Sequence, residues 1–174
     1  MRRFAVIVAL GALLGVLGGA VTEVPALAAG RGDGWHFARL PRHFTVPAVF
    51  CGFKFQATVL TNKSFIKALT SPDGSTTLLT GAVKIAFANP AAGKTVTTNV
   101  SGPTKVVTNP DGSATVLGKG HQLLSLTPAE QARFGLPGFL VFAGALTGTL
   151  APDGSITSLS PHGRVLVDVC TALT

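Results

Sequence analysis

The chain has few of the residues that metal sites and catalytic sites require. Its 174 residues include two cysteines, four histidines and seven acidic residues. The histidines (His36, His43, His121 and His162) are dispersed, and together with two cysteines they match no known spacing of metal ligands. No recognisable catalytic motif is present either. We therefore predict no metal site and no cofactor.

Tyrosine is absent, tryptophan occurs once, and no cluster of basic residues is present. Lysine and arginine number 14 against 7 acidic residues, which gives a net charge of +7, but the cations are scattered singly. Sites for single-stranded nucleic acid need aromatic stacking platforms, and nucleic-acid grooves need clustered cations. We therefore predict no nucleic-acid partner. A solvated basic surface instead suits an anionic cell-envelope polymer.

The long apolar run is confined to the N-terminus. Met1, Arg2 and Arg3 form a positive start, an apolar stretch follows over residues 4–17, and Ala26-Leu27-Ala28 is a small-x-small site. This pattern predicts a signal peptide over residues 1–28, cleaved after Ala28, and hence a secreted, extracellular protein. Cleavage removes Arg2, Arg3 and Glu23, which leaves 12 basic and 6 acidic residues and a net charge of +6. No second apolar span follows, so we predict no stable transmembrane span in the mature form.

The segment 29–49 contains glycines, prolines and arginines without sustained periodicity, and we interpret it as a flexible arm or linker. Residues 50–174 form the predicted domain. Its two cysteines, Cys51 and Cys170, would lie in an oxidising compartment, which favours a Cys51–Cys170 disulfide. A nucleophilic cysteine is the alternative, although neither cysteine has a histidine nearby in sequence.

A Pro-Asp-Gly-Ser turn occurs three times, beginning at Pro72, Pro110 and Pro152. Between and around these turns, β-rich runs predict an all-β, eight-stranded antiparallel meander. The expected strands are 50–60, 64–70, 76–88, 94–108, 114–126, 138–150, 155–160 and 163–170. Seven reversals would place every Pro-Asp-Gly turn at one end and return Cys170 to Cys51 at the other. We therefore expect a small barrel, closed at its seam by the disulfide.

One connection predicts helix. Thr127-Pro128-Ala129-Glu130 has the form of a capping box with proline at the first helical position, and Gly135 is suited to end the turn. We expect a short helical turn near 127–135.

The facing of two strands is ambiguous. In one reading Lys119, His121 and Arg164 face solvent. In the other reading Lys119, His121, Arg164 and Asp168 form a polar cluster in the barrel lumen, where a histidine could act as a base. A bulge at Gly118 and Gly120 would switch the register of the strand midway. The facing of the last strand is open in the same way, because Val165, Val167 and Val169 form its apolar set.

Four motifs resemble a family of small secreted actinobacterial proteins of unknown function. They are Cys51-Gly52-Phe53, the stretch 89–103 from Asn89-Pro90 to Gly102-Pro103, Pro137-Gly138-Phe139-Leu140, and Val167-Asp168-Val169-Cys170. The resemblance implies export and an all-β domain, and it brings no known activity. The expected architecture is also similar to allene-oxide-cyclase-like, dirigent-like and lipocalin-like barrels, although such likeness does not establish function.

Three hypotheses about function follow. The first is an exported, non-enzymatic β-barrel that binds a small apolar ligand or a cell-envelope component. The second is a barrel enzyme of the cyclase or dirigent type, acting on a small hydrophobic substrate. The third is a structural or interaction module of the cell envelope.

Overall fold

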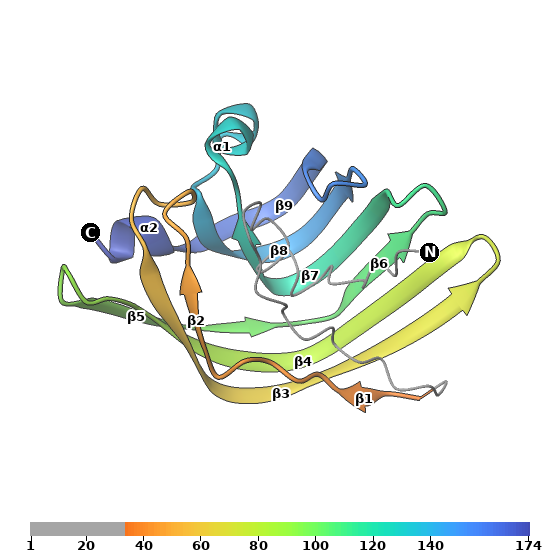
Figure 1. Cartoon of the computed structure of the whole chain (residues 1–174), viewed down its shortest axis with the longest axis horizontal. Coiled ribbons are helices and arrows are strands. Elements are labelled where there is room, and N and C mark those ends of the chain that lie inside the picture. The colour runs from red at the N-terminus through yellow and green to blue at the C-terminus, as the bar shows by residue number, and fades with distance from the viewer. Residues whose placement is uncertain (1–33) are drawn as a thin grey trace.

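A computed structural model describes residues 34–174, and the predicted signal peptide lies outside these residues. Most of the described chain is antiparallel sheet, accompanied by two short helices. In chain order the elements are β1 (His36–Phe37), β2 (His43–Val46), β3 (Phe55–Ser71), β4 (Gly74–Asn89), β5 (Lys94–Ser101), β6 (Thr104–Thr108), β7 (Ala114–Ser125), α1 (Pro128–Phe134), β8 (Phe139–Leu150), β9 (Ile156–Asp168) and α2 (Val169–Ala172) (Figure 1). The prediction of an all-β antiparallel fold is confirmed.

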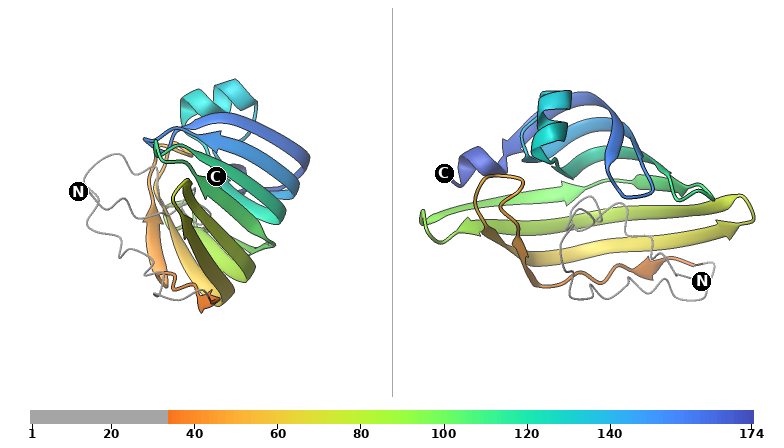
Figure 2. Two further views of the ribbon diagram at one scale, coloured as in Figure 1. Left: turned by 90° about the vertical axis from the view of Figure 1, so that its right-hand side faces the viewer. Right: turned by 45° about the horizontal axis from the view of Figure 1, so that its top comes forward.

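The nine strands form one sheet in which the order is β1-β3-β4-β5-β7-β8-β9 (Figure 2). Two positions in this order are each shared by two short strands. β1 and β2 both pair with β3, and β5 and β6 follow one another between β4 and β7. Thr, Val and other β-favouring residues dominate the strands, as expected for a sheet of this kind.

The predicted count of eight strands is wrong, for reasons visible at four places. The segment around Asn62 is a bulge inside the continuous strand β3, where the register shifts between Val59 and Thr61. Pro161 lies inside β9, an edge strand, which is where a sheet tolerates proline. The expected fourth strand is divided at Gly102-Pro103 into β5 and β6. Finally, β1 and β2 arise from the predicted linker.

The predicted arm is therefore partly sheet. Phe37 lies opposite Phe65, and the four residues of β2 pair with the start of β3. The side chain of Asn62 fixes this segment further, because its amide donates to the carbonyl oxygen of Ala38 at 2.6 Å. Ala38 and Val46 are buried. Among the described residues, 36–46 thus belong to the domain where a linker was expected.

The sheet has two ends in the described part of the chain. The pairing order is linear, and no strand pairing joins β9 to β1, β2 or β3 within residues 34–174. The expected closure by hydrogen bonds is therefore absent there. The predicted Cys51–Cys170 disulfide is confirmed, with Cα atoms 5.2 Å apart across a sequence separation of 119. A covalent bond, rather than a ladder of hydrogen bonds, connects the start of β3 to the end of β9.

A row of glycines crosses the sheet and marks where it bends. Gly120 lies opposite Gly144, which lies opposite Gly163, and the amide of Gly102 donates to the carbonyl oxygen of Gly81 at 3.1 Å. A Cβ atom built on any of these five glycines would collide with the backbone of a neighbouring strand. Glycine is required wherever backbones approach so closely. Figure 1 shows that the long strands of the sheet are curved.

The bend gives the sheet two hydrophobic clusters. In the larger cluster, Phe55, Phe87 and Phe139 pack edge to face with centroids 5.2 to 6.0 Å apart. Leu123 belongs to this cluster, whereas the next residue, Leu124, belongs to a second cluster with Leu140, Phe142 and Leu146. Both faces of β7 and β8 are therefore buried near α1. Each fully buried phenylalanine of this kind stabilises the fold by about 1.5 to 3 kcal/mol.

The two ends of the strands differ in their chemistry. The three Pro-Asp-Gly turns connect β3 to β4, β6 to β7 and β8 to β9, so the meander places them at one end, as predicted. Two of them form the same five-residue loop, closed by the bonds from Asn109 to Ser113 and from Ala151 to Ser155. The first turn is tighter, because Ser71 already pairs with Gly74. The opposite end, which holds the disulfide and both helices, is called the disulfide end below.

Candidate functional site

The outer face of the sheet, opposite the buried residues Ile66 and Leu79, carries rows of aligned side chains. Residues directly opposite each other in an antiparallel sheet project to the same side. One such row begins at Lys67 on β3 and alternates cations with leucines before it ends in hydroxyls on β8 and β9. Its members are Lys67, Leu78, Lys105, Leu117, Thr147 and Ser160.

A second row crosses the sheet on the other side of the glycines. Its members are Lys63, Ala82, Ser101, His121, Ala143 and Arg164. Lys119 lies between the two rows, in line with Ala145 and His162. Lys84, two residues after Ala82, lies on the same face because side chains alternate along a strand. The alanines and glycine backbone leave space around the long cationic side chains.

Together the outward cations form a surface that we call the basic face, which consists of Lys63, Lys67, Lys84, Lys105, Lys119 and His162. Lys67 is half-buried, and the other five are exposed. His121 is left out because it lines a small pocket with the inward residues Leu79 and Val83, and Arg164 lies in the row of His121. Aligned cations two strands apart are separated by about 10 Å, since neighbouring strands lie about 4.8 Å apart. This distance is comparable to the Debye length of about 8 Å at physiological salt, so the cations repel each other only weakly. Their attraction for an extended polyanion adds up over the whole face.

Acidic side chains are missing from this face in the described part of the chain. Three of the five aspartates and glutamates there, Asp73, Asp111 and Asp153, lie in the Pro-Asp-Gly turns. Glu130 is buried in α1, and Asp168 is the last residue of β9. Cross-strand pairs of opposite charge would stabilise a sheet, and the basic face has none.

The structure brings together three of the four residues of the predicted polar cluster. His121 and Arg164 lie in one row, on either side of Ala143, and Lys119 lies two residues before His121. Lys119 is exposed and belongs to the basic face, whereas His121 is half-buried and lines a small pocket with the inward residues Leu79 and Val83. Arg164 is exposed on the side of β9 that lies in line with His121. Asp168 lies at the disulfide end. Its carboxylate accepts hydrogen bonds from the amide and the hydroxyl of Thr171, at 3.1 and 2.7 Å, as the N-cap of α2.

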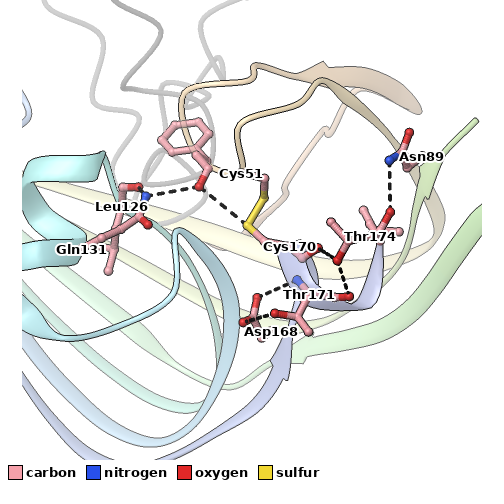
Figure 3. Close-up of a disulfide and its surroundings, with 10 residues drawn as sticks. Cys51, Asn89, Leu126, Gln131, Asp168, Cys170, Thr171 and Thr174 are labelled. Atoms are coloured by element: carbon pink, nitrogen blue, oxygen red, sulfur yellow. Dashed lines mark hydrogen bonds between the residues drawn. A yellow bond between two sulfur atoms is a disulfide. The ribbon is translucent and has the colours of Figure 1, made fainter. Parts of the chain in front are cut away.

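A hollow of about 490 Å³ lies beside the disulfide, where Asp168 forms part of its wall. Its other walls come from residues 48–52, from Pro128 and Gln131 of α1, and from Pro137, Gly138 and Cys170. Figure 3 shows that two polar side chains at the hollow, Gln131 and Asp168, have partners within the chain. The Gln131 amide donates to the carbonyl oxygens of Phe50 and Leu126, at 3.2 and 2.9 Å. The hollow is therefore mostly apolar, and these two polar side chains are already bonded.

The predicted helical turn is confirmed and fixes one rim of this hollow. Thr127 is the N-cap of α1, both halves of the capping box with Glu130 are present, and Gly135 ends the helix with φ 64°. The second oxygen of the Glu130 carboxylate accepts from the amide of Ile156 at 2.8 Å. One buried carboxylate thus connects α1 to the start of β9.

The sequence alone indicates only part of the basic face. Lys63 and Lys67 are four residues apart, which places them on one side of a strand. Without strand register the cations appear scattered, and only the pairing of β3, β4, β6, β7 and β9 brings them to one face.

In comparisons with known proteins, no family model, curated protein or solved structure matches the chain. Within residues 34–174, no three His, Cys, Asp or Glu side chains are grouped so that they could hold a metal ion. No helix in this described range is long and apolar enough to cross a membrane.

Proposed function

We propose that this chain is an exported, non-enzymatic protein that binds an anionic component of the cell envelope through its basic face. The observation that supports this proposal best is the one-sided charge of the sheet. Five lysine side chains share the face with one histidine, and no acidic side chain of the described chain lies among them. The disulfide supports export, because such bonds persist in oxidising compartments.

A small apolar ligand, the other partner expected from the sequence, has weaker support. Three phenyl rings fill the core at the disulfide end. The hollow outside that core is apolar, but the polar groups that would orient a ligand are bonded within the chain. Ligand sites usually combine apolar walls with a few available polar groups. We therefore assign the binding function to the basic face.

The proposal is tested by sedimentation of the protein with envelope fragments isolated from the producing cells. Lys105→Glu/Lys119→Glu reverses two exposed charges at the centre of the basic face. Lys54→Glu/Lys94→Glu is the matched control, since it changes net charge equally. Lys94 lies on the opposite side of the sheet, because it is two residues before the inward residue Val96 on β5. Lys54 precedes β3 at the disulfide end.

We expect the wild type and the control variant to bind, and rising salt to release both, because exposed charges are screened. Reversing Lys105 and Lys119 should weaken binding about tenfold or more, since each cation near an anionic surface contributes about 1 kcal/mol. Equal binding by both double variants would show that total charge, and not this face, is responsible. Binding that is insensitive to salt would also contradict the proposal.

A further inference from the structure

The basic face also carries large apolar side chains that the fold leaves in solvent. Phe37 and Phe65 lie opposite each other on β1 and β3, with ring centroids 6.0 Å apart in an edge-to-face arrangement. They are 53% and 44% exposed. Phe65 stands between Lys63 and Lys67 on the same side of β3, because side chains two residues apart share a face. Trp35, two residues before Phe37, is 49% exposed.

Leucines continue this pattern across the sheet. Leu78 separates Lys67 from Lys105 in the first row, and Leu117, which is 42% exposed, follows Lys105 on the next strand. Leu69 is likewise exposed, two residues after Lys67. The face is therefore amphipathic at the scale of single side chains, with cations and apolar groups alternating both along the strands and across them.

The bend of the sheet makes this face convex. At Gly120 the strand β7 folds toward the opposite side, where the side chain of Gln122 reaches back to the carbonyl oxygen of Lys119 at 2.9 Å. Gln122 also contacts the position that a Cβ atom on Gly118 would occupy. Lys119, just before the bend, is exposed on the outer side. Side chains on a convex surface protrude and reach a planar partner first.

We propose that the anionic component bound by the basic face is the surface of an anionic lipid bilayer, into whose headgroup region Phe37, Phe65 and Leu117 insert. This inference rests on the proposed function and names its partner. Lipid phosphates match the cations, and the boundary between headgroups and acyl chains matches aromatic rings and leucines. Lysine stems extend along such apolar surface while their ammonium groups stay in water.

A hydrated anionic polymer would interact favourably with the cations of this surface but not with its apolar side chains. It would pair with the lysines and leave the phenylalanines and leucines in water, where their exposure costs about 25 cal/mol for every Å². The convex shape and the interleaved apolar groups therefore favour the bilayer. Each cation near an anionic membrane is worth about fivefold in affinity, and the inserted apolar groups add to this.

The test uses the protein recovered after export, with its N-terminus determined by mass spectrometry and shared by every variant. Vesicles of phosphatidylcholine alone, and of phosphatidylcholine mixed with phosphatidylglycerol, are titrated into the protein. Trp35 is the single tryptophan of the chain, so its emission reports on this region alone. We expect its emission to shift to shorter wavelength with the anionic vesicles and to stay unchanged with the neutral ones.

Two variants separate insertion from simple charge attraction. Phe65→Ser/Leu117→Ser removes two apolar groups from the basic face and leaves every cation in place. Val49→Ser is the control, because Val49 has a matching exposure of 43% but lies beside the hollow at the disulfide end. We expect the double variant to bind anionic vesicles about tenfold more weakly, because the apolar area that it buries in the membrane is smaller by a few methylene groups or more. The control should bind like the wild type.

The outcomes distinguish this inference from the proposed function. Envelope binding without vesicle binding would overturn the bilayer as partner and indicate a polymer. Vesicle binding that is weakened by Lys105→Glu/Lys119→Glu but not by Phe65→Ser/Leu117→Ser, with no shift in Trp35 emission, would also overturn insertion. In both cases the basic face would remain a binding surface. Loss of binding to envelope fragments and vesicles alike would refute the proposed function itself.

Discussion

Gly120 on β7 lies directly opposite Gly144 on β8, and their φ angles are 88° and 142°. Side chains rarely tolerate such backbone conformations, and neither position has space for one. The pair stands at the centre of the glycine row along which the sheet bends. The same bend brings Leu123 to one hydrophobic cluster and Leu124 to the other, and it leaves Lys119 exposed on the basic face. Fold and candidate site thus depend on the same five positions.

We expect Gly144→Ala to lower the free energy of unfolding by at least about 2 kcal/mol, because a strained φ and a collision with the carbonyl oxygen of His162 occur together. Gly93→Ala is the control. Gly93 has φ 64°, but no heavy atom lies within 4 Å of the position that a Cβ atom would occupy there, so only the conformational cost of about 1 kcal/mol should remain. Urea denaturation measures both. Equal losses would show that the close strand approach is unimportant.

The sequence predicted the arrangement of the chain ends although it misplaced several turns. Asn62 and Pro161 suggested reversals, but Asn62 lies at a bulge and Pro161 lies on an edge strand. Each error divided one long strand into two short ones, so the predicted count of passes across the sheet was too high by two but remained even. After an even number of passes the chain returns to the end of the sheet at which it began. Cys51 and Cys170 therefore meet as expected, although the turns were misplaced.

The candidate site was less predictable than the fold. A strand alone shows which residues share a side, as with Lys63, Phe65 and Lys67. It does not show that Lys105, thirty-eight residues after Lys67, joins the same row. That relation depends on the register of two strand pairs, which the tight first turn at Pro72 and the turn over 90–93 between β4 and β5 set. Sequence patterning leaves both undetermined.

Glu130 offers a test of how α1 is held. Its carboxylate accepts from the amide and hydroxyl of Thr127 and from the amide of Ile156, all at 2.8 Å. We expect Glu130→Ala to destabilise the protein by about 2 to 3 kcal/mol, because hydrogen bonds to a charged group are lost and buried donors remain. Hydrogen exchange at the Ile156 amide should accelerate as well.

Arg133→Ala is the matched control on the same helix. Arg133 also contacts β9, donating to the carbonyl oxygen of Thr157 at 2.5 Å, but its side chain is exposed. Its loss should cost no more than about 0.5 kcal/mol, as is usual for surface positions. A comparable loss of stability in both variants would mean that Glu130 acts only as a surface contact.

The second and third Pro-Asp-Gly turns predict a pH effect. The side-chain hydroxyl of Ser113, followed by its amide, lowers the pKa of Asp111 below its ordinary value of 3.8, and Ser155 lowers the pKa of Asp153 in the same way. A pKa depressed by folding contributes stability that is present above the unfolded-state value and is lost as pH falls through the folded-state value. These turns should therefore loosen below pH 3.8.

We expect Ser113→Ala to raise the pKa of Asp111 toward its ordinary value, since the largest contribution comes from the removed hydroxyl. Carboxyl chemical shifts followed by NMR through an acid titration measure this directly. Asp153 serves as the internal control, because its own partner, Ser155, is untouched in that variant. An unchanged titration of Asp111, or an equal change at Asp153, would contradict the assignment.

The disulfide should contribute much of the stability, because it joins two parts of the sheet that no strand pairing connects within the described residues. Closing a loop of this length restricts the unfolded chain by about 4 to 5 kcal/mol. We expect Cys51→Ser/Cys170→Ser to lose most of this amount in urea denaturation, and reductant to lower the wild type to the same level without affecting the variant. Amide exchange should also quicken at α2, although the side-chain amide of Asn89 still donates to the carbonyl oxygen of Leu173 at 3.0 Å. An unchanged unfolding midpoint would show that packing between Val169, Leu173 and the phenylalanine core already holds the two parts together.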